Sequence, residues 1–417
     1  MIRRMTALVA IASAALATGA CANSSNGGST GNTLVVGVDL PRQGTQKDAS
    51  DATVNAMQLY LSQVGNKAGK YKVELKVYDD STAAKGAWDD ATCAKNAQEH
   101  VATENEVAVM GTYNSGCAKI EVPVLDQDPS GPMLMVSHAN TNPGLTKAWD
   151  TGEPDKYYPA KTRNYARVIT TDDYQGAAAA QFISKDLSVK KCYIVNDGET
   201  YGQGVAKAFA TEAAKQGITI LGQQSWDAKQ PSYEALFTQV KALNPDCLYI
   251  GGIYDNNGGQ LVKDKVKVLG DNTAVKMMGP DGFTGVPDLL KQSEAAGMYL
   301  SFAGLATDQL RAAGGAGAKL LDAYKAKYNM DPPTNYALYG VQALQVILAA
   351  IEKSDGTRKG VNAAVHSGAG ISMPAATAVL GKDIKIDPST GDISVRDISI
   401  EQVKDGKEAF LKPWPVG

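Results

Sequence analysis

Polar residues that could contact a ligand follow several apolar runs of this sequence. In VSHANTNPGLT, residues 136–146, the apolar run PMLMVS gives way to hydroxyl, imidazole and amide side chains and then to a proline. A short apolar run of this kind predicts a buried strand, so the polar residues would form a loop at its end. Such a loop can bind a small polar ligand. Its serine, threonine and asparagine side chains can also cap helices without any ligand, so both uses stay open.

Motifs for catalysis, for a metal or for a nucleotide are absent from the sequence. It contains no GxSxG nucleophile loop, no HExxH zinc motif and no Walker loop. Three histidines and no CxxC spacing argue against a zinc site. The 41 basic and 44 acidic residues nearly balance, which gives no attraction to nucleic acid. We therefore expect no enzyme, no cofactor, no metal and no nucleic-acid partner.

Tyrosine is unusually frequent, with 18 residues against six phenylalanines. A tyrosine joins a large apolar face to a hydrogen-bonding tip, which suits small-ligand pockets. The alternative is that these tyrosines belong to an ordinary core.

Alternating strands and helices must position the polar loops. Short β-branched runs alternate with helical patterns along most of the chain, which favours an α/β fold with doubly wound parallel sheets. At 417 residues the chain is long enough for two such Rossmann-like lobes. In open parallel sheets, ligands bind beyond the carboxyl ends of the strands. The loops expected there are DLPRQG, GTYNSGC, VSHANTNP, NDGETYGQG, GGIYDNNGG and MMGPDGF.

The last third of the chain predicts helices followed by strands. After GMYLSF the pattern indicates two more helices, and GKDIKIDPSTGDISVRDISIEQV then alternates as a β-hairpin does. The Pro-Ser-Thr-Gly segment inside it has the residue types of a turn.

The first 32 residues indicate export and tethering. Two arginines precede an apolar run over residues 7–17, and small residues then lead to Cys21. The run is shorter than the ~20 residues that a transmembrane helix needs. We expect a lipoprotein-type signal peptide over residues 1–20, lipidation of Cys21, and a flexible tether over residues 21–32. The protein would then be held on the outer face of the bacterial cell membrane; secretion with a free Cys21 is the alternative.

Four further cysteines are expected to form disulfides in an oxidising compartment. They can pair in three ways, and their spacing alone does not choose among these. Cys93 lies in an expected helix and Cys117 in the loop after VAVMG, while Cys192 and Cys247 each open an apolar strand. Because strand starts in a parallel sheet lie side by side, we favour Cys93 with Cys117 and Cys192 with Cys247.

The order and spacing of the loops resemble a known family. GTYNSGC, VSHANTNPGLT, DYQG, GETYGQG, GGIYDNNGG, MGPDGF and GKDIKIDPSTGD occur in the order seen in extracytoplasmic substrate-binding proteins of branched-chain amino acid ABC importers, which have the type I periplasmic binding protein fold. The resemblance spans roughly residues 34–412. It implies a monomer that closes two lobes on a small amino acid and delivers it to the permease of an ABC transporter. A binding protein that senses an amide, an aromatic or another amino acid and signals to a receptor is the alternative.

The resemblance also implies how the chain divides. We expect lobe 1 over residues 33–168 and 303–383, and lobe 2 over residues 169–302 and 384–417. A hinge of three segments would join them near residues 168–171, 301–304 and 382–386, with the ligand in the cleft between the lobes.

The resemblance further implies a pocket with two poles, because an amino acid is a zwitterion. Ser115, Ala139 and Thr141 match positions that bind the ligand carboxylate through hydroxyls and backbone amides at a helix start. Asp281 matches an acidic position that binds the ligand ammonium; a buried carboxylate is costly unless it is paired, and the ammonium would pair it. Helix capping by Ser115 and Thr141, and a turn role for Asp281, are the alternatives.

The remaining expected ligand contacts are four apolar or aromatic residues. They are Tyr113, Tyr201, Ile253 and Tyr254. Tyr201 matches a tyrosine of the family, whereas Ile253 stands where the family has a tyrosine, which leaves the side-chain selectivity open.

Three residues depart from the family pattern. His138 stands where the family often has proline, and we expect a hydrogen-bonded loop histidine without a binding role. Arg42 and Lys47 stand in the first loop, where small residues are common; we expect solvated surface charges, although a cation at the cleft would favour an acidic ligand.

Overall fold

The computed structural model describes residues 33–415. The expected signal peptide, the lipidated Cys21 and the tether lie outside these residues. Within the described part of the chain, every helix is too short or too polar to cross a bilayer.

The first sheet has six strands in the order β2–β3–β1–β6–β7–β8. Their bounds are β1 (Thr33–Leu40), β2 (Lys67–Ala68), β3 (Tyr71–Asp79), β6 (Glu106–Gly111), β7 (Leu134–Ser137) and β8 (Tyr165–Arg167). All neighbours pair in parallel except β2 and β3. The last six residues of β1 and all of β6 are buried, as expected for strands covered on both faces.

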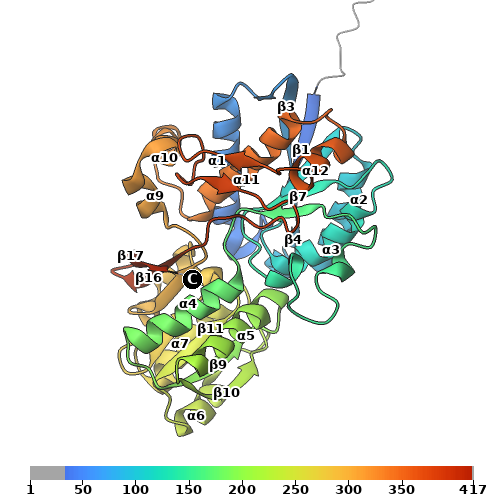
Figure 1. The fold of residues 1–417 in the computed structure, drawn as a ribbon. Helices are drawn as coiled ribbons and strands as arrows, with labels where there is room; N and C mark the ends of the chain where they lie inside the picture. Colours follow the sequence, from blue (N-terminus) through green and yellow to red (C-terminus); the bar gives the residue numbers. More distant parts are fainter. Residues whose placement is uncertain (1–32, 416–417) are drawn as a thin grey trace, which may run out of the picture. The chain divides into compact units, whose positions relative to one another are not determined.

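Helices cover both faces of the first sheet. They are α1 (Lys47–Gln63), α2 (Asp90–Ala102), α3 (Ser115–Asp126), α11 (Tyr336–Glu352) and α12 (Arg358–His366), and α10 (Gly315–Tyr328) packs against α1. Helix α1 packs against α11, and α2 packs against α3 on the other side of the strands (Figure 1). The small elements β4 (Ser81–Thr82), β5 (Ala87–Trp88), α9 (Thr307–Ala313), β14 (Ser372–Met373) and β15 (Ile384–Lys385) complete this half.

The second sheet has seven strands in the order β10–β9–β11–β12–β13–β16–β17. Their bounds are β9 (Lys191–Asn196), β10 (Thr219–Ser225), β11 (Cys247–Gly251), β12 (Lys276–Gly279), β13 (Tyr299–Phe302), β16 (Asp397–Lys404) and β17 (Lys407–Pro415). The first five are parallel, and β16 and β17 are antiparallel additions at one edge.

The second sheet is also covered on both faces. Its helices are α4 (Asp172–Lys185), α5 (Thr200–Lys215), α6 (Glu234–Ala242), α7 (Gly258–Leu269) and the short α8 (Pro287–Lys291). Alternate residues of β9 face opposite sides: Cys192 and Ile194 join the core beneath α4 and α5, whereas Tyr193 and Val195 join the core beneath α6 and α7. The expected α/β fold with two doubly wound sheets is confirmed.

The chain passes between the two sheets three times, and the three passages touch each other. They follow β8, follow β13 and precede β16. Thr170 joins them, because its backbone N–H donates to the carbonyl of Ala303 at 3.0 Å and its hydroxyl donates to the carbonyl of Asp397 at 3.0 Å. The third passage comes after the expected residues 382–386, since Gly391 still accepts a bond from the Arg167 backbone at 2.9 Å.

Two local expectations for the end of the chain need correction. Four helices, α9 to α12, follow β13 in place of two, and positive φ angles at Gly314 and Gly315 separate α9 from α10. The Pro-Ser-Thr-Gly turn brings Ile386 and Ile393 into a single antiparallel bridge only. The long hairpin is β16–β17, and its turn is Asp405–Gly406, where both residues have positive φ.

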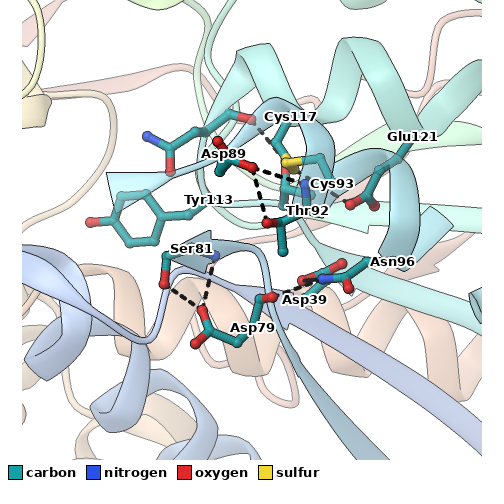
Figure 2. The surroundings of a disulfide bond; sticks show 12 residues. Asp39, Asp79, Ser81, Asp89, Thr92, Cys93, Asn96, Tyr113, Cys117 and Glu121 are labelled. Carbon is teal, nitrogen blue, oxygen red and sulfur yellow. Dashed lines mark hydrogen bonds between the residues drawn. A yellow bond between two sulfur atoms is a disulfide. The ribbon is translucent and has the colours of Figure 1, made fainter. Parts of the chain in front are cut away.

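One of the two expected disulfides is present. Cys93 and Cys117 are bonded, with their Cα atoms 5.6 Å apart, and link α2 to α3 (Figure 2). The second expectation is wrong: Cys192 and Cys247 are buried thiols. They are register partners on the parallel strands β9 and β11. On such strands the two side chains project in the same direction, whereas a disulfide needs the two sulfurs to turn toward each other.

Candidate functional site

Asp281 joins the two halves of the described chain. It lies in the turn after β12, and only 2% of its surface is exposed. One carboxylate oxygen accepts a hydrogen bond from the hydroxyl of Tyr201, at the start of α5, and the other accepts one from Tyr336, at the start of α11. Burial raises the pKa of Asp281, while the two hydroxyls act to lower it. A carboxylate has about four acceptor positions, so two bonds leave room for a further donor.

An aromatic cluster from the first half lies against this carboxylate. The ring of Tyr336 is 5.0 Å from that of Tyr113 and 5.8 Å from that of His138, and the rings of Tyr113 and His138 are 5.3 Å apart. Burial first, and then the charge of Asp281, raise the pKa of Tyr113. Rings and hydroxyls together give this cluster apolar and polar contacts for one small molecule.

The surroundings of the His138 ring differ from those expected. It is fully buried, and neither ring nitrogen has a hydrogen-bond partner within residues 33–415. Burial lowers the pKa of His138 to about 3, so the ring is neutral and keeps one N–H donor and one acceptor. The expectation of a hydrogen-bonded loop histidine is therefore wrong, because the ring packs against tyrosines and not against a polar group.

The structure brings Ser115 and the loop after β7 together. Ser115 is the first residue of α3, and its hydroxyl accepts a bond from the backbone N–H of Asn142 at 3.4 Å. The N–H of Ala139 donates to Ser137 at 3.1 Å. The hydroxyl of Thr141 is buried without a partner among the described residues.

Helix capping explains only one residue of this group. Asn142 caps the short helix η3 (Pro143–Leu145) by accepting a bond from Gly144 at 3.0 Å. No side chain caps α3. The capping alternative therefore accounts for Asn142 and leaves the hydroxyls of Ser115 and Thr141 for another use.

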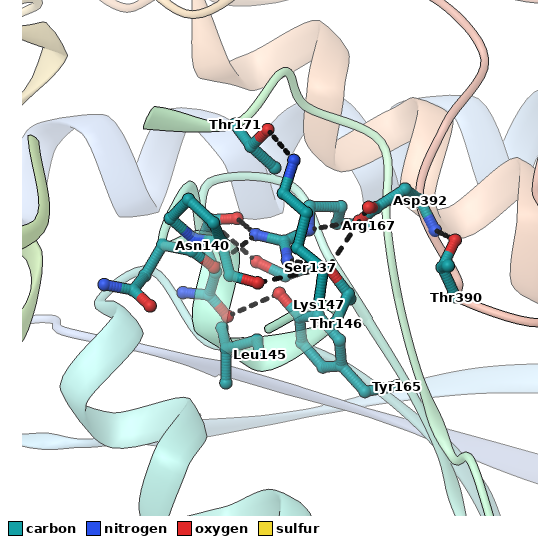
Figure 3. A network of polar contacts seen from close by, with 12 residues as sticks. Ser137, Asn140, Leu145, Thr146, Lys147, Tyr165, Arg167, Thr171, Thr390 and Asp392 are labelled. Carbon is teal, nitrogen blue, oxygen red and sulfur yellow. Dashed lines mark hydrogen bonds and ion pairs between the residues drawn. The ribbon is translucent and has the colours of Figure 1, made fainter. Parts of the chain in front are cut away.

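A buried arginine fixes the shape of the loop after β7. Arg167, on β8, donates to the backbone carbonyls of Asn140 and Asn142 at 2.8 and 2.9 Å (Figure 3). Its other nitrogens bond to Thr146 at 2.6 Å and to Asp392 at 2.8 Å. These bonds satisfy loop carbonyls that would otherwise be buried without donors, so the loop is rigid before any ligand arrives.

Asp172 is a buried acid beside the loop after β7 that the sequence did not reveal. It opens α4 and is fully buried, and neither carboxylate oxygen has a hydrogen-bond partner in the described chain. Its backbone N–H donates to the carbonyl of Thr141 at 2.9 Å. Burial first, and then the charge of Asp281, raise the pKa of Asp172. The sequence reads TTDD here, and two acids at a helix start are ordinary, so nothing marked the first as buried.

The two expected ligand contacts from the loop after β11, Ile253 and Tyr254, lie in different surroundings. Ile253 packs with Trp88 and the disulfide of the first half, and its N–H donates to Asp197 at 3.0 Å. Tyr254 turns into the core beneath α7, where its ring lies 6.0 Å from Phe283 and its hydroxyl accepts a bond from Gln292 at 3.1 Å. Ile253 therefore lies beside Tyr201, whereas Tyr254 lies away from the other candidate ligand contacts.

The charges around the site are acidic. Within residues 33–415, no lysine or arginine forms an ion pair with Asp172 or Asp281. Arg42 and Lys47 both pair with Asp51 on the partly exposed face of α1, as surface charges do. Such an acidic site suits a ligand with a positive group.

The sequence matches the family described as periplasmic binding protein over residues 33–407. The chain belongs to the periplasmic binding protein family. As a member, it is a substrate-binding protein and not an enzyme, and it acts outside the cytoplasm. This confirms the family expectation.

Curated relatives and solved structures agree with this membership. The Leu/Ile/Val-binding protein BraC3 of Rhizobium johnstonii is 26% identical over 90% of this periplasmic binding protein and 92% of its own length. The Leu/Ile/Val/Thr-binding protein of Salmonella typhimurium is 27% identical over 78% and 86%. The leucine binding protein LivK of Thermotoga maritima has a TM-score of 0.74 at 21% identity, covering 91% of this chain and 98% of its own. A solute binding protein of R. palustris in complex with benzoate has a TM-score of 0.73 at 19% identity, covering 92% and 97%. These structures show the shared fold.

Proposed function

We propose that this chain captures a small amino acid, of the branched-chain type or related to it, and delivers it to an ABC transporter permease. The observation that carries the proposal is the carboxylate of Asp281, which is buried between Tyr201 of one half and Tyr336 of the other. In the proposed organisation, lobe 1 comprises residues 33–168 and 303–383 together with the adjoining segment up to the third passage, and lobe 2 comprises residues 169–302 and the end of the chain from β16 onward. A lipidated Cys21 would tether the monomer to the membrane.

Each pole of an amino acid has a matching group. The ammonium would bind Asp281, where it would neutralise a buried charge. The carboxylate would bind at the start of α3, where Ser115 supplies a hydroxyl and the helix end supplies partial positive charge. The rigid segment from Ala139 to Thr141 would supply the other donors.

The ligand side chain would lie among Tyr113, His138, Tyr201 and Ile253. These residues are apolar or neutral, in keeping with the names of the relatives, which are Leu/Ile/Val-binding proteins. Benzoate, bound by one structural neighbour, has no positive group. The acidic pair without a basic partner therefore favours an amino acid over an aromatic acid.

Capture would proceed by closure of the lobes. The ligand would dock on lobe 1, and lobe 2 would then bring Asp281 and Tyr201 to it and exclude water, which strengthens the charged contacts. The three adjoining passages at Thr170 give this motion its hinge. The closed form would be the one that the permease recognises.

The role of Asp281 can be tested by calorimetry on the chain from residue 33 onward. Wild-type protein should bind at least one of leucine, isoleucine, valine and alanine, and Asp281→Ala should weaken that binding by about 2 kcal/mol or more, roughly 30-fold. Asp288→Ala, a change of an exposed acid on α8, is the matched control. Equal affinity in the two variants would remove Asp281 from the site.

Import and sensing can be separated in cells. Deletion of the cognate permease should abolish uptake of the bound amino acid if the protein serves import. Uptake that persists, with loss of a transcriptional response when the binding protein is deleted, would favour the sensing alternative.

A further inference from the structure

Asp172 is a buried acid that the proposed function does not yet use. None of its surface is exposed, and both carboxylate oxygens lack a hydrogen-bond partner among residues 33–415. A buried carboxylate without partners is strongly disfavoured, because its charge loses hydration and gains nothing in return. Such a group takes up a proton, or it gains a cationic partner in a functional state.

Contacts place this carboxylate beside the proposed ligand site. Its backbone N–H is bonded to the carbonyl of Thr141, whose hydroxyl is also buried without a hydrogen-bond partner among the described residues and acts to lower the pKa of Asp172. On the opposite side lies α5: a Cβ atom at Gly204 would be 3.6 Å from the Oδ2 atom of Asp172. The first turn of the same helix carries Tyr201, which is bonded to Asp281. Asp172 thus lies between the loop after β7 and the helix that presents Tyr201.

No basic side chain of the described residues forms an ion pair with Asp172. The charge of Arg167 acts to lower the pKa of Asp172, but the nitrogens of Arg167 are bonded to Asn140, Asn142, Thr146 and Asp392. Lys147 pairs with the neighbouring acid Asp173 at 2.7 Å. A cation that bonds directly to the carboxylate of Asp172 therefore has to come from outside the described chain.

We propose that Asp172 is a second residue for the positive pole of the ligand, so that Asp172, Asp281 and the hydroxyl of Thr141 together bind a primary ammonium group. This inference rests on the proposed function and narrows its substrate class. A primary ammonium has three N–H donors, which matches these three acceptors, and the hydroxyl of Thr141 can accept from the ammonium while its O–H donates to the ligand carboxylate. The site would then require a free amine, and it would reject amides, N-acylated amino acids and aromatic acids that lack a cation.

The test compares Asp172→Asn with Asp173→Asn. The second variant removes an acid one residue away that pairs with Lys147 on the partly exposed surface, so it is the matched control. The probe is whichever of leucine, isoleucine, valine and alanine binds wild type most tightly. Asp172→Asn should weaken that binding about 10-fold or more, while Asp173→Asn should retain it.

A change in stability distinguishes binding from a structural role. Asparagine has nearly the shape of aspartate and no charge to bury, so Asp172→Asn should melt at or above the wild-type temperature without ligand. A melting temperature clearly below that of Asp173→Asn would show a structural role and overturn the proposal.

Ligand analogues and proton release provide two further readouts. The N-acetyl derivative of the probe keeps the carboxylate and the side chain but has no cation, so wild-type protein should not bind it measurably. Because burial and Asp281 raise the pKa of Asp172, with Arg167 acting in the opposite direction, ammonium binding should release protons at neutral pH. Calorimetry in phosphate and in Tris should detect this release in wild type and less of it in Asp172→Asn.

The possible outcomes separate this inference from the proposed function. Equal affinity of the two asparagine variants, or tight binding of the N-acetyl derivative, would overturn the inference and leave amino acid capture intact. Failure of wild type to bind any of the four amino acids would overturn the proposed function, and the inference with it.

Discussion

At the residue scale, the site consists of buried polar groups that come from distant parts of the chain. The sequence predicted Ser115, Thr141, Tyr201 and Asp281 as candidates, because each stands at a strand end within a family-like segment. It could not predict Tyr336. This residue is 55 positions away from Asp281 in the sequence, and the two meet only in the folded chain. Only the surplus of tyrosine over phenylalanine hinted at such a role.

Asp172 shows a different limit of sequence reasoning. Asp172 and Asp173 are adjacent acids in the first turn of one helix, and the helix dipole favours both equally. Folding buries the first and leaves the second to pair with Lys147. The difference comes from which side of α4 faces the loop after β7, and that is a property of tertiary packing.

Tyr336→Phe should weaken amino acid binding through its effect on Asp281. The hydroxyl of Tyr336 acts to lower the pKa of that buried carboxyl, so its removal should raise this pKa and reduce the ionised fraction that an ammonium needs. We expect about 10-fold weaker binding at pH 6, with partial recovery at pH 8. Calorimetry at both pH values checks this, and Tyr328→Phe, which changes a partly exposed tyrosine of α10, should bind as wild type does. A uniform loss at both pH values would contradict the ionisation argument.

At the element scale, a buried ion cluster ties the first strands to α2. His100 lies between the carboxylates of Asp39 on β1 and Glu106 on β6, and all three side chains are fully buried. Burial acts to lower the pKa of His100, but the bonds to the two carboxylates prevail and raise it to about 9. Gly37 makes this packing possible, because a Cβ there would lie 2.9 Å from the imidazole ring.

This cluster predicts a pH dependence of stability. The folded-state pKa of His100 is above the unfolded value, so its stabilisation is fully present below pH 6.5 and is lost as the pH rises through about 9. The loss should be on the order of 3 kcal/mol in the free energy of unfolding. Urea denaturation of wild type at pH 6 and pH 9.5 measures it.

His100→Gln supplies the control for this dependence. The variant cannot carry the charge, so its free energy of unfolding should be lower at pH 6 and should change much less between the two pH values. An equal pH dependence in the variant would assign the effect to other groups.

At the scale of the whole described chain, the fold was more predictable than the site. Parallel strands buried on both faces are continuous apolar runs, so β6, β7, β9, β11 and β12 stand out in the sequence. Asp405–Gly406 is a strong hairpin signal, but the Pro-Ser-Thr-Gly segment also has turn residues, so the sequence pattern predicts the hairpin at the wrong turn. The third crossing was misplaced for a related reason, since the bonds of Gly391 and Asp392 to Arg167 are long-range contacts that no local pattern encodes.

If the two lobes close on a ligand, the surroundings of those tryptophans that lie at contacts between the lobes should change. Trp88 packs with Ile253, and the carbonyl of Trp149 accepts a bond from Lys207 at 3.0 Å, so both report on contacts that cross between the two sheets. Trp226, bonded to Asn256 at 2.6 Å, and Trp414, which packs against Phe182, stay within the second half. In protein labelled with 5-fluorotryptophan, the amino acid should shift the fluorine resonances of the first pair and leave the second pair in place. Single Trp→Phe variants assign the four signals, and a resonance of Trp88 that does not move at saturating ligand would contradict capture by closure.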